Sequence, residues 1–387
     1  MTAVLETDSI LDDFDAALTA ASEELAHLRV PAEDVATALN QSRELMNWLH
    51  DGGWTRWGWP EHVGGLGGSS LIRCQIVERL ALAGYPIPDH LLVLEVVGPA
   101  IVKHAPDLAA ERLPTALRGD ELWSQGFSEP EAGSDLAALR TKAVRREDGD
   151  FVINGQKIWT SYGAFADRIV LLARGGTVDD RHRGLVMLLV DLNAEGIERR
   201  PIALASGREE LAEVFFTDAV VGADRVIGAE GTGWSVAMDL LQYERGTYAW
   251  MRMATATAYL QQLLIALDTQ QPSANAAPTV GQAYLNLAAL RARTAATLRR
   301  LDAGEPVGAE TSVDKLLLST AEQAVLDAAA ALLPVQFLLS DTTEAAHWRD
   351  HWWYSRAASI YGGAREVQYS IIADRILKLP KENTGGR

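Results

Sequence analysis

The sequence of 387 residues contains a single cysteine, Cys74. One cysteine cannot form an internal disulfide, and Cys74 has no Cys or His neighbour at the spacing of a metal site. The sequence also lacks the run of about 20 uncharged apolar residues that a membrane helix needs. Its acidic start lacks the basic and then apolar pattern of a secretory signal. We therefore expect a cytoplasmic protein without a bound metal or a membrane contact, in which Cys74 is a small core residue rather than a catalytic thiol.

Positive charge is scarce, because 35 Lys and Arg stand against 52 Asp and Glu, for a formal net charge of −17. Such a charge repels phosphate backbones and disfavours nucleic-acid binding. A small anionic ligand is compatible with it, because a few local Arg or Lys residues suffice to bind one. The length and the large apolar fraction favour a folded protein with several packed layers.

Three regions with different hydrophobic periods follow one another along the chain. Residues 1–120 have apolar positions at helical spacing, residues 121–226 change to short β-type runs, and residues 227–387 are helical again. We expect an α+β fold, mostly α, with an N-terminal helical domain, a central β domain and a C-terminal helical domain. The helices expected in the first region are Leu11–Leu28, Asp34–His50, Ser70–Ala83 and His90–Ala105.

The central region is expected to contain a hairpin. Phe151–Ile153 and Lys157–Thr160 flank Asn154–Gly155, a pair typical of a tight two-residue turn. Further strands are expected at Arg168–Ala173, Gly184–Asp191, Ile197–Ala203 and Ala212–Asp218. The last region is expected to contain a helix from about Thr232 to Leu267, a polar loop at Asp268–Thr279, and helices at Gly281–Leu301, Glu310–Leu339 and Ala364–Ile376.

The segment Gly126–Asp135 is the richest in groups that can carry chemistry. Its small residues let a backbone approach a planar ring closely, and its hydroxyls and amides offer hydrogen-bond donors. From the residues alone, an ordinary polar turn that caps an element is the favoured interpretation.

Four segments, in order and spanning nearly the whole chain, resemble the acyl-CoA dehydrogenase family. Ser128–Asp135 is similar to the family's flavin-contacting Thr-Glu-Pro-x-Ala-Gly-Ser-Asp, and Ser128 keeps the hydroxyl of the usual Thr. Asn154–Trp159 matches Asn-Gly-x-Lys-x-Trp, and the other two matches are Trp59–Gly65 and Ile360–Arg375. The resemblance implies an N-terminal helical domain, a central β-barrel-like domain, a C-terminal four-helix bundle and FAD as the cofactor.

The resemblance also implies which residues bind the cofactor and the substrate. Ser128 would contact the N1–N5 edge of the flavin, and Trp159 would lie along the flavin face away from the substrate. Cofactor contacts are implied for Gln125, Phe127, Ser128, Gly133, Ser134, Trp159 and Ser161. Substrate contacts are implied for Ser134, Gln242, Tyr243, Arg245 and Tyr361.

The catalytic base needs separate treatment. In many family members a Glu follows the Tyr of the C-terminal motif, but here Gly362 follows Tyr361. Other members, including some that act on branched or long chains, carry the base just before an Arg on the first long helix of the C-terminal region, and Glu244–Arg245 matches that pair. Glu244 lies at helical spacing with an apolar stripe, where desolvation makes a carboxylate a better base. The competing interpretation is a solvated Glu-Arg pair on a helix surface. The stripe consists of Val236, Leu240, Tyr243, Tyr248 and Met251.

The resemblance implies a dehydrogenation of an acyl-CoA thioester. Glu244, beside Arg245, would take the α-proton while the β-hydride passes to flavin N5. The amide of Gly362 would stabilise the charge that develops on the thioester oxygen. The implied electron acceptor is an electron-transferring flavoprotein.

Contacts that homotetrameric members make to the flavin of a neighbouring subunit are missing. Leu267–Ala277 contains no Arg-x-x-Phe-Gly, and Gln336–Ser340 replaces the Gln-x-x-Gly-Gly segment. We therefore expect a heteromer with a related subunit, as in actinobacterial enzymes for bulky steroid side chains, which this chain resembles. The alternatives are a related flavin oxygenase and a structural partner subunit of a heteromeric acyl-CoA dehydrogenase.

Overall fold

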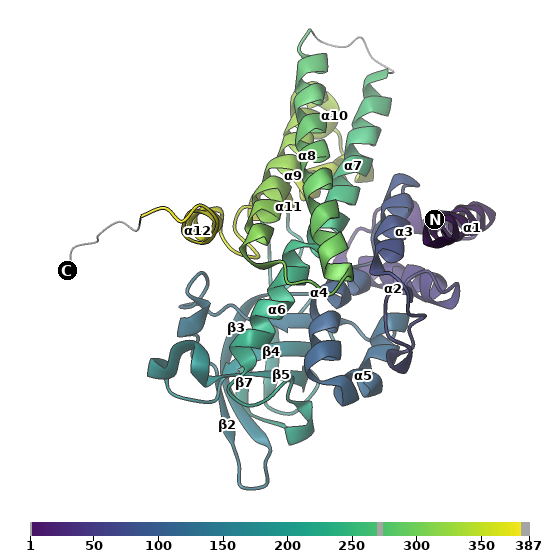
Figure 1. The fold of residues 1–387 in the computed structure, drawn as a ribbon. Coiled ribbons are helices and arrows are strands. Elements are labelled where there is room, and N and C mark those ends of the chain that lie inside the picture. The colour runs from purple at the N-terminus through teal and green to yellow at the C-terminus, as the bar shows by residue number, and fades with distance from the viewer. Residues whose placement is uncertain (1, 269–273, 381–387) are drawn as a thin grey trace. The chain divides into compact units, whose positions relative to one another are not determined.

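The computed structural model describes residues 2–268 and 274–380. The chain forms two compact units, of which the first ends at Tyr243 and the second begins at Glu244 (Figure 1). The first unit contains five N-terminal helices and a sheet, whereas the second has helices and no strand in its described residues. The expected α+β fold, mostly α, is confirmed, and the domain boundaries at 120 and 226 stay a prediction. Within the described ranges, no helix has the length and apolar character needed to cross a bilayer.

The N-terminal helices are α1 (Thr2–Ala20), α2 (Val35–Asp51), α3 (Ser70–Leu82), α4 (Asp89–His104) and α5 (Pro106–Arg118). Helices α1, α2 and α3 pack around an apolar core that includes Phe14, Leu45 and Ile76. The expected α2, α3 and α4 are confirmed, whereas α1 begins earlier and gives way to a 3-10 turn before Leu28. The prediction missed α5, in which two prolines hide the helical pattern. Pro106 stands at its first position, where the missing N–H has no intrahelical bond to lose.

Seven strands form one sheet in the order β1-β4-β2-β3-β7-β6, with β5 paired to β4. The strands are β1 (Trp123–Gly126), β2 (Lys142–Arg145), β3 (Phe151–Ser161), β4 (Arg168–Arg174), β5 (Leu185–Asp191), β6 (Ile197–Ile202) and β7 (Leu211–Val221). Their inward side chains form a second apolar core, to which Phe151, Ile169 and Val214 belong. The four strands expected after residue 168 are confirmed, with small shifts at their ends.

The hairpin expected at Asn154–Gly155 is wrong, because β3 runs through these residues as one strand. Both halves of β3 pair antiparallel with β7, and the register shifts between Ile153 and Gly155. Gly155 therefore belongs to a β-bulge and has a φ of +150°, a conformation open to glycine. The hairpin in this region instead joins β2 to β3.

Four long helices of the second unit pack side by side: α7 (Thr247–Asp268), α8 (Ala276–Asp302), α9 (Thr311–Leu332) and α11 (Thr343–Ala357) (Figure 1). The expected helix over Glu310–Leu339 divides at Leu333 into α9 and α10 (Pro334–Leu339), and α11 was not predicted. The helix expected over Ala364–Ile376 is α12 (Arg365–Ile371) followed by a π-helical turn. Of the loop expected at Asp268–Thr279, residues 269–273 lie outside the described residues, and α8 already begins at Ala276.

The single long helix expected to carry Glu244 is two helices. The first, α6 (Gly233–Arg245), ends before Gly246, and α7 begins directly after that glycine. Glycine has a low helix propensity and no Cβ, so it suits an interruption. Glu244 and Arg245 consequently lie in the last turn of α6, and the expected apolar stripe is not one face of a continuous helix.

We predict that Gly155→Ala destabilises the first unit. A Cβ at Gly155 would come within 2.6 Å of the Thr141 backbone, so the bulge must shift. Overpacking of this kind costs about 2 kcal/mol of unfolding free energy, measured by urea denaturation. The control is Gly175→Ala, whose Cβ would meet no atom nearer than 3.8 Å. Equal stability of the two variants would contradict the packing role of the bulge.

Candidate active site

Two segments of the first unit that were expected to contact a flavin lie next to each other. The chain leaves β1 through Phe127 and Ser128 and passes beside the second half of β3. The N–H of Ile158 donates to the carbonyl oxygen of Ser128 over 3.0 Å. The hydroxyl of Ser124 donates to the carbonyl oxygen of Ser161 over 2.8 Å. These hydrogen bonds bring the end of β1 and the end of β3 into one surface.

A buried ion pair fixes this surface to the sheet. Lys157 Nζ donates to Glu129 Oε1 over 2.8 Å and to the carbonyl oxygen of Phe127 over 3.1 Å. Glu129 also accepts the backbone N–H groups of Arg140 and Thr141. Burial lowers the pKa of Lys157 to about 8, although Glu129 raises it. Burial also opposes the charged form of Glu129, but Lys157 and the other donors bring the pKa of Glu129 below its usual value.

Trp159 presents an exposed aromatic face beside this surface. Its side chain is 55% exposed, and its φ of +61° is rare for a bulky residue. It falls where the register of β3 with β7 shifts, between Lys157 and Thr160. The hydroxyl oxygen of Thr160 is buried without a partner in the described part of the chain. An exposed ring in a strained conformation, beside an unsatisfied hydroxyl, fits a planar cofactor with hydrogen-bonding edges, as a flavin has.

The remaining residues expected to bind ligands in the first unit differ in how far they are buried. Gly133 and Ser134 are exposed, and a Cβ built on Gly133 would meet no protein atom within 4 Å. The packing of the chain therefore does not require glycine there, and its surface is open to a ligand. The amide of Gln242 donates to Asp239 over 3.0 Å. Burial raises the pKa of Tyr243, although Lys103 lowers it.

The proposed base and the glycine at the usual base position meet in the second unit. Gly362 has a φ of +61°, and a Cβ built on it would collide with Oε1 of Glu244. The Glu244 carboxylate therefore occupies the space into which a side chain at 362 would project. The N–H of Gly362 donates no hydrogen bond within the described residues, so it is available to a ligand oxygen.

Several polar side chains close in sequence to Glu244 or to Gly362 are largely buried. Burial lowers the pKa of Arg245, although Glu244 raises it, and Arg245 Nε is buried without a hydrogen-bond partner in the described ranges. Burial raises the pKa of Tyr361 well above its usual value, and its hydroxyl also has no partner among the described residues. Gln368, fully buried, likewise leaves its amide unpaired there. This part of the second unit therefore contains several polar groups that a bound molecule could satisfy.

Sequence reasoning missed the buried charged residues around Tyr361. Arg252 forms an ion pair with Glu322, and both side chains are buried. Lys315 is 4% exposed, and its Nζ lies 3.8 Å from the centre of the Tyr361 ring. A sequence signal was available, because Lys315 and Glu322 are seven residues apart and share one face of α9 with core residues.

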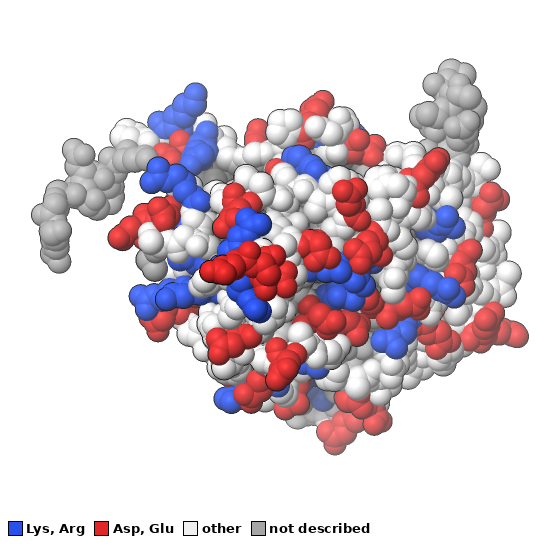
Figure 2. All heavy atoms as spheres, turned by 90° about the horizontal axis from the view of Figure 1, so that it is seen from below, with Lys and Arg blue, Asp and Glu red and all other residues white. Residues whose placement is uncertain are grey.

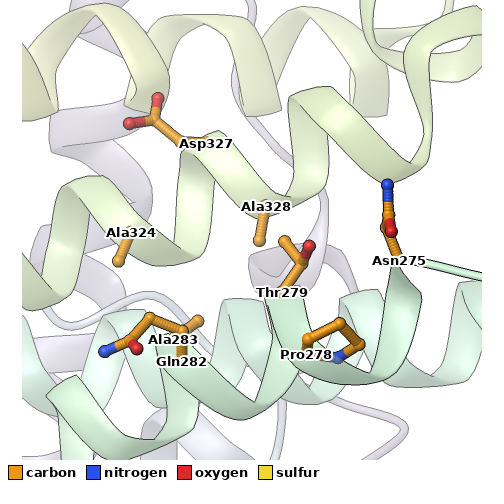
Figure 3. Close-up of a pocket in the computed structure, with 8 residues that line it drawn as sticks. All are labelled: Asn275, Pro278, Thr279, Gln282, Ala283, Ala324, Asp327 and Ala328. Carbon is orange, nitrogen blue, oxygen red and sulfur yellow. The ribbon is translucent and has the colours of Figure 1, made fainter.

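An open hollow between α8 and α9 is not part of this arrangement (Figure 3). Its charged lining residue, Asp327, accepts a hydrogen bond from Trp352 and pairs with Arg356 over 3.0 Å. None of the residues expected to act in catalysis lines it, so we assign no chemistry to it. The lining consists of Asn275, Pro278, Thr279, Gln282, Ala283, Ala324, Asp327 and Ala328.

The excess of acidic residues does not produce a continuous field of one sign on the face shown in Figure 2. Acidic side chains there are interspersed with Lys and Arg. Local cationic groups are thus present despite the net charge of −17, as an anionic ligand requires.

Comparisons with known proteins show which family the chain resembles in sequence and in fold. The acyl-CoA dehydrogenase middle-domain model matches residues 124–219, and the C-terminal-domain model matches residues 231–377. Acyl-CoA dehydrogenase IpdE1 of Mycobacterium tuberculosis is 35% identical over 355 residues, which cover 90% of each chain. The solved Tcur3481-Tcur3483 steroid ACAD has a TM-score of 0.81 at 24% identity and covers 98% of both chains. The ChsE4-ChsE5 complex from Mycobacterium tuberculosis has a TM-score of 0.79 at 24% identity, covering 97% of this chain and 98% of that chain.

Two matched domain models and a relative that is 35% identical over most of its length define the class: the chain belongs to the acyl-CoA dehydrogenase family. It is an oxidoreductase of this flavin-dependent family. The expected family, fold and enzyme class are confirmed.

We predict that Lys157→Met strongly destabilises the first unit. The variant leaves the Glu129 carboxylate buried without its cation, which costs about 3 kcal/mol of unfolding free energy in urea denaturation. The control is Arg181→Met, which breaks the exposed ion pair with Asp135 in the same segment. Its effect should be too small to measure, because exposed pairs contribute little. Equal losses in both variants would contradict an anchoring role of the buried pair.

Proposed function

We propose that the chain catalyses the α,β-dehydrogenation of an acyl-CoA thioester, with FAD as cofactor and Glu244 as the base. The observation that carries this proposal is the Glu244 carboxylate in the space of the missing side chain at Gly362. Many family members have a Glu at that position in the sequence. A carboxylate that arrives from another helix fills the same space and serves the same purpose.

The acidity of the substrate determines what else the second unit must supply. The α-proton of a thioester is far less acidic than a carboxylic acid, so the charge on the thioester oxygen needs a donor. The N–H of Gly362, which has no acceptor among the described residues, is that donor in our proposal. Glu244 keeps the α-proton while the double bond forms, and Arg245 lies beside it in the last turn of α6.

The flavin-binding surface in our proposal is the one formed by the ends of β1 and β3. Bound FAD supplies the two-electron acceptor for the hydride that leaves the β-carbon. Its position is held by Trp159 and by the hydroxyl of Ser128, which the Lys157–Glu129 pair anchors indirectly. The proposed cofactor contacts are Gln125, Phe127, Ser128, Gly133, Ser134, Trp159 and Ser161.

The proposed substrate class is a bulky acyl-CoA of the steroid type. Its support is the similarity of the fold to that of a solved steroid ACAD, together with the proposed position of the base at Glu244. The proposed substrate contacts are Ser134, Gln242, Tyr243, Arg245 and Tyr361.

We also propose a heteromeric assembly with a related subunit, and an electron-transferring flavoprotein as electron acceptor. Two solved relatives each combine two named proteins, the Tcur3481-Tcur3483 steroid ACAD and the ChsE4-ChsE5 complex. This chain lacks the two segments with which homotetrameric members contact a neighbouring flavin. A related subunit would supply those contacts.

We predict that Glu244→Gln lowers kcat by about 1,000-fold, because Gln cannot accept the α-proton. The measurement is acyl-CoA-dependent reduction of an artificial electron acceptor by the flavin-loaded protein, at equal flavin content. The matched control is Glu366→Gln, an exposed carboxylate on α12, which should retain full activity.

Two outcomes would contradict this assignment. Unchanged activity of Glu244→Gln in an active complex would favour a structural partner subunit, in which this carboxylate does no chemistry. Rapid reoxidation of the reduced flavin by air would favour a flavin oxygenase.

We predict that the chain purified alone binds FAD substoichiometrically and that co-expression with a related subunit restores one FAD per site. The ratio of flavin to protein absorbance measures this directly. Full occupancy and full activity of the isolated chain would contradict the heteromeric proposal while leaving the role of Glu244 intact.

A further inference from the structure

Lys315 is a buried cation that the proposed reaction does not yet use. Within the described residues its ammonium donates no hydrogen bond and forms no ion pair within 4 Å. Burying an ammonium in this way is costly. Burial accordingly lowers the pKa of Lys315 to about 7, although Glu244 raises it. Because burying this ammonium destabilises the fold, we expect a function that requires Lys315 at this position.

Lys315 and Glu244 reach the same point from two different helices. Lys315 Nζ lies 3.5 Å from the Cβ position built on Gly362, and Oε1 of Glu244 is in contact with that same position. The two charges are therefore no more than about 6 Å apart, a range in which opposite charges favour each other's ionised form. The ring of Tyr361 holds the ammonium in place, with Nζ 3.8 Å from the ring centre.

The other charged groups of this cluster do not neutralise Lys315, because they are paired with each other or are themselves positive. Arg252, on α7, is paired with Glu322, on α9. Arg245 and Arg252 both disfavour the charge on Lys315, whereas Glu244 favours it. Tyrosine is neutral at ordinary pH. The tyrosines of the cluster are Tyr248, Tyr354 and Tyr361.

The location of Glu244 explains why a cation is useful there. Glu244 lies in the last turn of α6. The partial negative charge at a helix C-terminus disfavours a carboxylate. A base must nevertheless be ionised before it can take a proton, so a neighbouring positive charge offsets the unfavourable helix end.

We propose that Lys315 is a positioning residue for the base, whose ammonium holds the Glu244 carboxylate against Gly362. This inference rests on the proposed function, because it takes Glu244 to be the base. Lys315 forms and breaks no bond in the reaction. It acts through Glu244 and through its contact with Tyr361.

The first test is the pH dependence of α-proton exchange between an acyl-CoA thioester and deuterated water, with the flavin-loaded enzyme. In Lys315→Met the exchange rate should fall about tenfold at pH 6, with little change in KM, because the carboxylate loses the cation that holds it against Gly362. The two rates should converge at pH 9, because Lys315 itself loses its charge as the pH rises above about 7. Lys315→Arg, which keeps a cation, should restore the rate at pH 6.

The control is Lys142→Met, which removes an exposed lysine from β2 and should leave the profile unchanged. If Lys315→Met does not fold, Lys315→Gln provides the neutral variant. A loss of exchange that is the same at every pH, or an unchanged rate at pH 6, would overturn the inference.

The second test needs no activity and no flavin. Urea unfolding at pH 6 is measured for the full-length wild type, Lys315→Met, Glu244→Gln and the double variant. We expect the effects to be non-additive by about tenfold in the unfolding equilibrium constant, because each single variant removes one partner of a coupled pair. Additive effects would overturn the inference.

The two proposals fail in different ways. If Glu244→Gln retains α-proton exchange, Glu244 is not the base, and the proposed function fails with the role of Lys315. If Glu244→Gln abolishes exchange while Lys315→Met keeps the wild-type pH profile, only the inference about Lys315 fails.

Discussion

The surface formed by the ends of β1 and β3 depends on one buried interaction, the ion pair between Lys157 and Glu129. Glu129 accepts hydrogen bonds from the backbone N–H groups of Arg140 and Thr141, and Lys157 donates one to the carbonyl oxygen of Phe127. A single ion pair therefore fixes a loop that has no regular secondary structure. Lys157 belongs to strand β3, so the ion pair fastens the loop to the sheet. Because both charges are satisfied by several partners, the desolvation that each suffers is offset locally.

In the second unit the buried charges are less completely paired. Around Tyr361 the cations outnumber the anions, and several polar atoms have no partner within the described residues. Such an arrangement is poor for stability and suitable for a site that exchanges protons with a ligand. The two units thus differ in how their buried polar groups are paired. In the first unit the buried charges have several partners, whereas in the second unit several polar groups have none within the described residues.

The sequence predicted the family, the α+β class and most helices and strands, because hydrophobic period and in-order motifs are local properties. It also paired Glu244 with Gly362, although 117 residues lie between them, because the family resemblance supplied the long-range link. The Asn154–Gly155 hairpin failed because pairing with β7 outweighed a local turn preference. The break at Gly246 was missed although glycine has a low helix propensity, because one glycine does not always end a helix. The burial of Lys315 escaped prediction because it depends on packing against other helices.

The contact between Gly362 and Glu244 has a consequence for substitutions at position 362. Any side chain there would meet Oε1 of Glu244, which can move away because it is the far end of a flexible side chain. Glycine at 362 is therefore what leaves the Glu244 carboxylate in its present place, so even alanine at this position is expected to relocate that carboxylate while leaving the surrounding helices as they are.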